Sequence, residues 1–287
     1  MKTNMARILC LVLALMMSVA CFTACKKDDD ATPTDVTNTD VNDTVSLVED
    51  VVVEVGPGEG TLTKEISKKA KRVICIELDS TLKDKLELLT TECENVEIIY
   101  DNVLKTYIPP CTKIVSALPY SIIEPFINKL LKCDFEEVVL LMGNRYVDSV
   151  ITGKITKLSL LTNCFFKSEK GREVLPESFN PKPHCLSSFI KLTPISKEYY
   201  KEESTLFFFR EMFFRRLLKI KKSLMEGLID FYKMHNRTLT KKEAKKKIEQ
   251  LGLKEDLLNK NMESLSNEEL QKFYDFLVNK KDILWKD

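Results

Sequence analysis

From residue 48 onward, short apolar runs alternate with longer segments in which apolar residues recur at helical spacing. Runs rich in β-branched residues predict buried strands, because such side chains pack well on a pleated surface. Longer segments with apolar positions three or four residues apart predict helices that cover a sheet. The predicted strands are 50–55, 72–78, 96–100, 113–118 and 137–143, and the predicted helices are 61–70, 80–91, 121–132 and 144–152.

This alternation predicts an α/β fold with a mostly parallel, doubly wound sheet. In such sheets, ligands bind outside the carboxyl ends of the strands. Small or polar residues end four of the predicted strands, and we expect all four ends to face one crevice. These ends carry Glu54 and Gly56, Glu77 and Asp79, Asp101 and Asn102, and the segment Ala117–Tyr120.

The segment Val51–Thr63 reads Val-Val-Val-Glu-Val-Gly-Pro-Gly-Glu-Gly-Thr-Leu-Thr. A valine-rich strand runs into three glycines between positions 56 and 60, which permit a tight turn and a close approach of backbone to ligand. Strand, glycine turn and helix N-terminus together predict a nucleotide-type site. Thr61 or Thr63 is predicted to cap the helix that follows.

The spacing of the glycines indicates which nucleotide. A dinucleotide fingerprint, G-x-G-x-x-G, would need its third glycine at Thr61, whereas this chain has G-x-G-x-G. With Glu54 two residues ahead, this loop resembles that of S-adenosylmethionine (SAM) methyltransferases. The next strand ends in Glu77 and Asp79, where a carboxylate accepts ribose hydroxyls, and Glu77 is the first candidate. A glycine turn that only joins strand to helix, and a solvated strand end, are the alternatives.

Composition narrows the class of protein. The chain has 287 residues and a net charge of +1, so it can bury a large core and is not a polycation as a whole. Basic residues nonetheless outnumber acidic ones 14 to 7 between positions 201 and 250. Nine cysteines without a C-x-x-C pair, and two histidines, predict neither a metal site nor a disulfide framework. The cysteines indicate a reducing compartment, and we expect a cytoplasmic protein.

The first 25 residues contradict that compartment. A basic start, an apolar run over 8–20 and then Cys21 and Cys25 resemble a bacterial lipoprotein signal peptide. Residues 26–48, rich in Asp, Thr and Asn, predict a disordered linker. A membrane-anchored lipoprotein is therefore the alternative localisation, and a prefix joined by fusion or misprediction also fits.

Two further segments match blocks of one protein family. Val115–Pro125, Val-Ser-Ala-Leu-Pro-Tyr-Ser-Ile-Ile-Glu-Pro, resembles the N-[LI]-P-Y segment of the ribosomal RNA adenine N6-dimethyltransferases. That family includes the kasugamycin-resistance-type small-subunit enzymes and the erythromycin-resistance methylases. Phe179–Pro183 resembles the family's F-x-P-x-P block, and Ser187–Thr193 resembles its last strand. Together with the glycine loop, the resemblance extends over about residues 48–285.

The resemblance implies methylation at N6 of an adenine that is flipped out or already unpaired, with SAM as the donor. It implies that Tyr120 and Phe179 stack on the two faces of the base, and that the carbonyl before Pro119 accepts from the N6 amine. Ordinary packing is the alternative for each ring. Positioning and electrostatics, rather than an acid or base, would supply the rate. The implied catalytic set is Ala117, Leu118, Pro119, Tyr120 and Phe179.

The residues implied to bind the cofactor lie at the four predicted strand ends. They are Glu54, Gly56, Pro57, Gly58, Gly60, Thr61, Leu62, Glu77, Leu78, Asp101, Asn102 and Ser116. The family's catalytic Asn is Ala117 here, and its Asp that contacts the SAM adenine aligns with Asn102. The family's Gln-x-Phe-Leu segment before the glycine loop is replaced by the lipoprotein-like prefix. We expect weakened SAM binding and slow or absent turnover.

After residue 193 the pattern becomes helical and basic. Residues 204–232 form a long stretch rich in Phe and Leu, and Thr240 with Glu243 and Ser266 with Glu269 predict capped helix starts. The resemblance implies a Rossmann-like SAM-dependent methyltransferase domain at 49–195 and a small α-helical RNA-binding domain at 196–287. Phosphate contacts are implied for Arg215, Arg216, Lys219, Lys221 and Lys222, with a solvated face as the alternative.

The favoured function is SAM-dependent N6-methylation, with dimethylation expected, of adenine in ribosomal RNA. The expected partner is the small ribosomal subunit, and the expected state is a monomer. A non-catalytic rRNA-binding or ribosome-assembly factor that kept the fold is the first alternative, and Ala117 favours it. A small-molecule methyltransferase is the second, and it predicts no salt-sensitive RNA binding.

Overall fold

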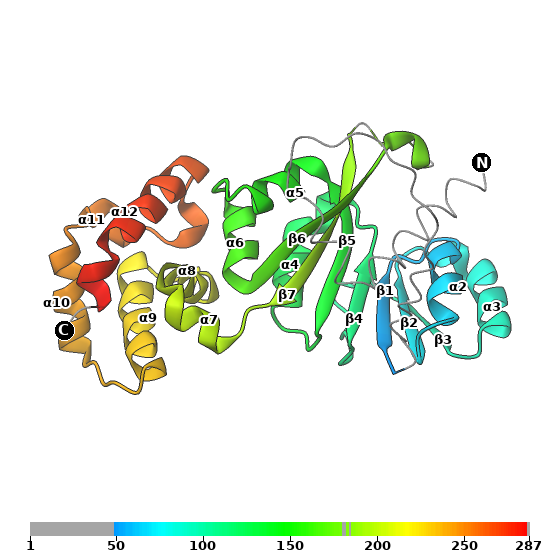
Figure 1. Cartoon of the computed structure of the whole chain (residues 1–287), viewed down its shortest axis with the longest axis horizontal. Helices are drawn as coiled ribbons and strands as arrows, with labels where there is room; N and C mark the ends of the chain where they lie inside the picture. Colours follow the sequence, from blue (N-terminus) through cyan, green and yellow to red (C-terminus); the bar gives the residue numbers. More distant parts are fainter. Residues whose placement is uncertain (1–48, 180–181, 184, 286–287) are drawn as a thin grey trace, which may run out of the picture. The chain divides into compact units, whose positions relative to one another are not determined.

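The computed structural model describes residues 49–179, 182–183 and 185–285. They form two compact units (Figure 1). Unit 1 runs to Val147 and resumes at Glu169–Thr193, and unit 2 comprises Asp148–Ser168 and the chain from Pro194 onward. Unit 2 thus includes a segment that precedes the predicted boundary at residue 195. The predicted signal and linker, residues 1–48, lie outside the described residues.

Unit 1 is built on a seven-stranded sheet with the order β3-β2-β1-β4-β5-β7-β6. The first five strands pair in parallel, and β7 runs antiparallel to β5. This order is typical of Rossmann-like methyltransferases, so the predicted fold class is confirmed. The strands are β1 (Val51–Val55), β2 (Arg72–Glu77), β3 (Val96–Tyr100), β4 (Lys113–Ser116), β5 (Glu137–Gly143), β6 (Phe166–Val174) and β7 (Ser187–Pro194). The helices that follow β1, β2, β4 and β5 are α2 (Thr61–Ser67), α3 (Lys83–Glu92), α4 (Ile123–Leu130) and α5 (Asn144–Ile151).

The core of unit 1 follows from the valine-rich strands. Val52 and Val53 of β1 and Val138 of β5 are fully buried, because parallel strands covered on both faces need apolar side chains on both. On one face, Val52 packs with Ile66 of α2 and Phe189 of β7. β6 was not predicted from sequence. It lies at the edge of the sheet, where polar side chains in its sequence reach solvent and no apolar run is needed.

Unit 2 is helical. Its helices are α6 (Lys157–Phe165), α7 (Lys197–Glu202), α8 (Ser204–Phe214), α9 (Ile220–Met234), α10 (Lys241–Leu251), α11 (Glu255–Asn259) and α12 (Asn267–Trp285). The predicted helical stretch 204–232 is interrupted between α8 and α9, where Lys219 forms an isolated bridge with Asn261. Both predicted caps are confirmed, since Thr240 and Glu243 form a capping box and the Ser266 hydroxyl accepts from the Glu269 N–H.

The described residues contain neither a membrane-spanning helix nor a metal-ligand cluster. No helix among them is both long enough and apolar enough to cross a membrane. Within the same residues, no three His, Cys, Asp or Glu side chains are grouped in a way that could hold a metal ion.

Candidate active site and nucleic-acid interface

The glycine loop joins β1 to α2 at the carboxyl edge of the sheet. Gly56, Gly58 and Gly60 have φ angles of 71°, 58° and 78°, a left-handed region that other residues rarely adopt. The Gly56 N–H donates to the Ile76 carbonyl at 3.0 Å, which ties the loop to β2. A Cβ at Gly56 or Gly58 would meet no atom within 4 Å. A ligand therefore has room to approach this backbone.

Gly60, rather than Thr61 or Thr63, is the N-cap residue of α2. Its carbonyl accepts the first helical hydrogen bond, from the Lys64 N–H, at 3.0 Å. A Cβ at Gly60 would lie 2.5 Å from Leu89 Cδ2 in α3, so packing as well as φ requires glycine. The predicted threonine cap is wrong, because no side chain caps this helix and Thr63 is fully buried.

Glu54 is buried beneath α2, with 2% of its surface exposed. Its Oε2 accepts from the Thr63 hydroxyl at 2.7 Å and from the Cys75 thiol at 3.7 Å. Burial, partly opposed by these two hydrogen bonds, raises the pKa of Glu54 to about 7. Thr63 and Cys75 are not among the site residues predicted from the sequence. The β1–β2 register pairs Glu54 with Cys75, and sequence spacing does not reveal that register.

Glu77 ends β2, and its carboxylate contacts the glycine loop. Its Oε2 accepts from the Gly58 N–H at 3.1 Å, and its Oε1 accepts from the Asp79 N–H at 2.8 Å. Each carboxylate oxygen has a second lone pair, so the group can still accept from ribose hydroxyls. Asp79, the second candidate, instead accepts from the N–H and the hydroxyl of Thr81. The contact with the loop makes Glu77 the stronger candidate.

Asp101 and Asn102 follow β3, the strand beside β2. The Asp101 N–H donates to the Glu77 carbonyl at 2.9 Å, so the two strand ends are in contact. The Thr106 hydroxyl and the Asn102 N–H donate to the Asp101 carboxylate and lower its pKa. The Asn102 side-chain oxygen accepts from the Leu104 N–H at 2.9 Å. Its NH₂ group has no partner among the described residues and is available to a ligand.

The segment after β4 begins beside the glycine loop. The Ser116 hydroxyl donates at 2.6 Å to the carbonyl that ends β1. Ala117 is exposed and Leu118 is buried. Pro119 is exposed and leads into a 3-10 turn that begins at Tyr120. The Tyr120 side chain lies outside the described part of the structure, so its predicted contact with the base stays a prediction.

The remaining predicted residues of unit 1 differ in exposure. Phe179 and Leu62 are half-buried and pack against the same apolar layer of the unit. Pro57 is buried within the loop, Thr61 opens α2, and Leu78 is largely exposed just after β2. Part of the Phe179 ring therefore serves packing, which is the alternative that its sequence context left open.

Hydrogen bonds link the four strand ends in the order in which they lie in the sheet. Asp101 bonds to Glu77, Glu77 bonds to Gly58, and Ser116 bonds to the end of β1. An open glycine backbone beside a carboxylate suits a ligand that carries a ribose and a charged amino acid end. The residues present at this edge therefore fit SAM.

In unit 2, the two arginines predicted to contact phosphates are paired with acids. Arg215 bonds to Glu211 and, at 2.7 Å, to Asp230, and Arg216 bonds to Glu263 at 2.9 Å. Arg215 is half-buried. Because Glu211 lies in α8 and Asp230 in α9, its ion pairs join the two helices. A phosphate at Arg215 would have to compete with two carboxylates.

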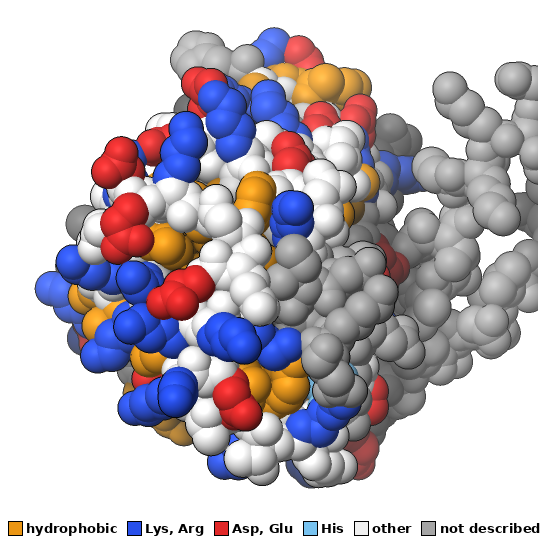
Figure 2. All heavy atoms as spheres, turned by 90° about the vertical axis from the view of Figure 1, so that its left-hand side faces the viewer, with side chains coloured by type: hydrophobic (Ala, Val, Ile, Leu, Met, Phe, Trp, Pro, Cys, Tyr) orange, Lys and Arg blue, Asp and Glu red, His pale blue; other side chains and the backbone are white. Residues whose placement is uncertain are grey.

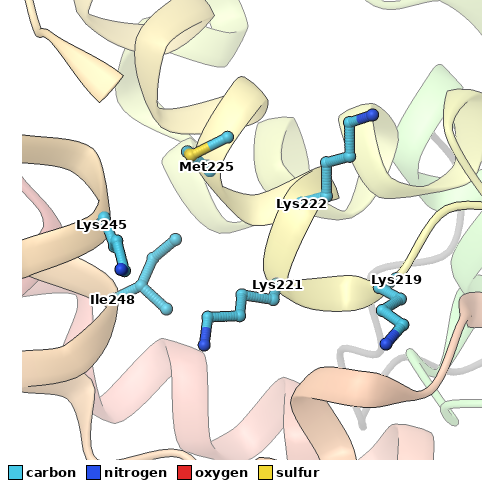
Figure 3. Close-up of a pocket in the computed structure, with 6 residues that line it drawn as sticks. All are labelled: Lys219, Lys221, Lys222, Met225, Lys245 and Ile248. Carbon is cyan, nitrogen blue, oxygen red and sulfur yellow. The ribbon is translucent and has the colours of Figure 1, made fainter. Parts of the chain in front are cut away.

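The three predicted lysines lie at the N-cap and in the first turn of α9, and they border a cavity of about 260 Å³ (Figure 3). The cavity is lined by Lys219, Lys221, Lys222, Met225, Lys245 and Ile248. Figure 2 shows the side of the molecule on which α9, α10 and α11 lie, and Lys and Arg side chains gather there with acids interspersed. α10 alone carries five lysines and two glutamates.

Comparison with known proteins places the chain in a family. A family described as "Ribosomal RNA adenine dimethylase" matches residues 34–268. A probable ribosomal RNA small subunit methyltransferase A from Methanococcus maripaludis is 34% identical over 224 residues, covering 76% of this chain and 78% of that protein. A protein of the same name from Methanococcoides burtonii is 30% identical over 234 residues, covering 79% and 83%.

A solved structure agrees at the level of the fold. The crystal structure of a dimethyladenosine transferase from Plasmodium falciparum matches with a TM-score of 0.54 and 23% identity, covering 82% of this chain and 91% of that one. The resemblance seen in the sequence motifs is thereby confirmed over most of the chain. The chain belongs to the ribosomal RNA adenine dimethylase family.

Proposed function

We propose that this chain is an enzyme that transfers methyl groups from SAM to N6 of adenines in small-subunit ribosomal RNA. The observation that carries the proposal is the glycine loop whose Gly58 N–H is bound by the Glu77 carboxylate, in a member of this family. The names of its relatives specify small-subunit ribosomal RNA. The lysine-rich surface of unit 2 offers a docking site for a polyanion.

The strand ends of unit 1 would bind the cofactor. When bound, SAM supplies an activated methyl group. Glu77 would accept from the ribose hydroxyls, and the open backbone at Gly56 and Gly58 would let the amino acid end approach closely. The Asn102 side chain would bind the adenine ring, with Asp101 fixing the turn behind it. Ser116 holds the end of β4 against β1, which fixes where the next segment starts.

The segment Ala117–Tyr120 would bind the target base. An adenine in a helix must leave its stack before N6 can be reached, at a cost of a few kcal/mol. The Leu118 carbonyl precedes Pro119, which has no N–H, and it would accept from the N6 amine. Tyr120 and Phe179 would contact the faces of the ring, each contributing about 1–3 kcal/mol. Together, the carbonyl and the two rings would place the N6 nitrogen in line with the methyl group of SAM.

Ala117 weakens this arrangement. An Asn side chain at this position would offer a second acceptor to the N6 amine, and alanine offers none. Loss of one such acceptor in a transition state costs about 2–4 kcal/mol. We therefore expect slow turnover with the reaction type unchanged.

A direct assay tests the proposal. The chain is incubated with isotopically labelled SAM and small ribosomal subunits that lack adenine methylation, and with the naked ribosomal RNA. The RNA is digested, and nucleosides are identified by mass. We expect N6-methyladenosine or its dimethyl form, with Glu77→Ala abolishing both SAM binding and product. A chain that binds SAM and the subunit but gives no methylated adenosine at stoichiometric enzyme would refute the proposal.

A non-catalytic ribosome-assembly factor is the second candidate, and the exposed alanine at position 117 favours it. This candidate predicts that the chain binds the subunit equally well with and without SAM and never transfers a methyl group. Calorimetric titration of SAM, run beside the assay, separates the two functions.

A further inference from the structure

The cavity at the start of α9 belongs to unit 2 alone. α9 supplies three lining residues, its N-cap Lys219 a fourth, and α10 supplies two (Figure 3). Its volume of about 260 Å³ lies just below the ~300 Å³ at which pockets for drug-sized ligands begin. The cavity therefore suits a single ring system better than an extended ligand.

The cavity combines an apolar floor with a cationic rim. Ile248 is buried and Met225 is half-buried, and the lysine stems add methylene groups to the same surface. In Figure 3 the ammonium groups of Lys221 and Lys245 extend from α9 and α10 toward the space beside Ile248. None of the six lining residues is acidic. A ligand that satisfies both parts carries a flat apolar surface and at least one negative charge.

Two lysines of the rim can accept an anion. Lys245 has no ion-pair partner within the described residues, and Lys221 pairs with Glu255 at 3.4 Å, where Glu255 is 65% exposed. An exposed pair of this kind is worth about 0–1 kcal/mol, so a phosphate can displace the carboxylate. The first turn of α9 contains no acid, and the positive end of its helix dipole adds to the attraction.

We propose that this cavity binds the base of one unpaired ribosomal RNA nucleotide, while Lys221 and Lys245 bind its flanking phosphates. The inference rests on the proposed function for the identity of the RNA. Bases in a paired helix hide their faces in the stack, whereas bases in loops and bulges can be splayed out into a protein. A duplex keeps its bases stacked, so it would leave Met225 and Ile248 uncovered and gain nothing from the cavity. An acidic peptide would leave the same floor uncovered.

The test compares two hairpin RNAs with the full chain. One carries a single bulged 2-aminopurine, and the other is fully paired. The variant Lys221→Met/Lys245→Met keeps the apolar stems and removes two charges at the rim. Lys242→Met/Lys246→Met removes two charges from exposed lysines of α10 outside the cavity and is the matched control.

We expect the rim variant to bind the bulged hairpin about 10-fold more weakly and the paired hairpin within about twofold of the unmodified chain. The salt dependence of bulge binding should lose about 1.4 from its log–log slope, about 0.7 for each single-strand phosphate. Met225→Gln should reduce the fluorescence change of the 2-aminopurine while leaving the salt slope unchanged. Circular dichroism checks that each variant is folded.

Three outcomes would overturn the proposal. They are equal losses in the rim and control variants, equal binding of bulged and paired hairpins, and a 2-aminopurine signal that does not respond to Met225→Gln. The result is separable from the proposed function, because hairpin binding is measured without SAM. If the chain transfers methyl groups but the rim and control variants bind the bulged hairpin alike, only the cavity proposal is refuted. If bulge binding depends on the rim lysines but no methyl group is transferred, only the proposed enzyme activity is refuted.

Discussion

Ala117 occupies the point where β4 leaves the sheet, and its side chain is exposed. The adjoining Ser116 hydroxyl is bonded to the end of β1, and Leu118 is buried, so the backbone on both sides of Ala117 is fixed. A longer side chain at this position can extend into solvent or toward a base without disturbing the core. The chemistry of this position is therefore separable from the fold.

Ala117→Asn should raise the rate of methyl transfer. The amide oxygen would accept from the N6 amine, and an acceptor worth about 2–4 kcal/mol corresponds to roughly 30- to 900-fold in kcat. The measurement is kcat on undermethylated small subunits, with Ala117→Leu as a control that adds bulk without an acceptor. An asparagine variant no faster than the leucine variant would show that a different group positions the amine.

Glu54 should make stability depend on pH in an unusual direction. Its pKa is about 7 in the folded chain and about 4.5 in the unfolded one, so across this window the folded state retains a proton that the unfolded state releases. The free energy of unfolding therefore falls as pH rises from about 4.5 to 7 and is constant above. The difference of about 2.5 between these pKa values corresponds to about 3 kcal/mol.

Glu54→Gln removes this ionisation while its side-chain oxygen can still accept from Thr63. Urea denaturation at pH 5 and pH 8 should show the variant gaining stability relative to the parent chain at the higher pH. A constant difference between the two proteins across this range would mean that Glu54 does not titrate near neutrality.

At the residue scale, the clustering of the polar strand ends is predictable from sequence, whereas the contacts among them are not. The glycines, Glu77 and Asp101 follow from strand-end logic, and they do lie together. The bond between Thr63 and Glu54 was not predicted, because the sequence favoured Thr61 or Thr63 as a helix cap. Whether a threonine caps a helix or faces the sheet depends on where the first turn starts. Gly60 is the N-cap of α2, so Thr61 and Thr63 both lie inside the helix.

At the scale of elements, the sequence predicted strands wherever both faces are buried. The valine runs of β1 and β5 are unambiguous, whereas the edge strand β6 is polar and gives no signal. The break between α8 and α9 was missed for a different reason. Apolar residues continue through Leu217 and Leu218, and the turn is fixed by a bridge between Lys219 and Asn261, which are distant in sequence.

The junction of β1, the glycine loop and α2 gives an element-scale prediction. Gly60→Ala should destabilise the chain by more than Gly153→Ala. Both glycines have positive φ, at 78° and 68°, but only a Cβ at Gly60 meets another atom, Leu89 Cδ2, at 2.5 Å. We expect a loss of about 1 kcal/mol at Gly153 and a further 1–3 kcal/mol at Gly60 from overpacking. Thermal denaturation of both variants is the measurement, and equal shifts in Tm would exclude the clash.

At the scale of the whole molecule, two units divide the predicted tasks. Unit 1 holds the glycine loop and the polar strand ends proposed to bind SAM, and unit 2 holds the lysine-rich face. The helical nature of the C-terminal part followed from sequence, but the inclusion of residues 148–168 did not. That segment joins unit 2 through tertiary contacts such as the edge-to-face pair of Phe165 and Phe214, which spacing along the chain does not encode.

Binding to ribosomal RNA should weaken steeply with salt. A surface that neutralises several phosphates releases as many counterions, so affinity should fall by about 10² or more between 50 and 200 mM salt. Filter binding across this range is the measurement, and SAM binding in the same buffers is the control because SAM is not a polyanion. A flat response would favour the small-molecule methyltransferase over the rRNA enzyme.

Helix α6 precedes the rest of unit 2 in the chain, and this limits how related genes can recombine. Leu160, Leu161 and Phe165 are buried, and the Tyr200 hydroxyl donates to the Cys164 carbonyl at 2.6 Å. Recombination between related genes at a single crossover near residue 195 would join α6 from one parent to C-terminal helices from the other. Substitutions in α6 and in the C-terminal helices that contact it must therefore be compatible with each other. A chimaera that takes its RNA-binding helices from a relative needs α6 from the same relative.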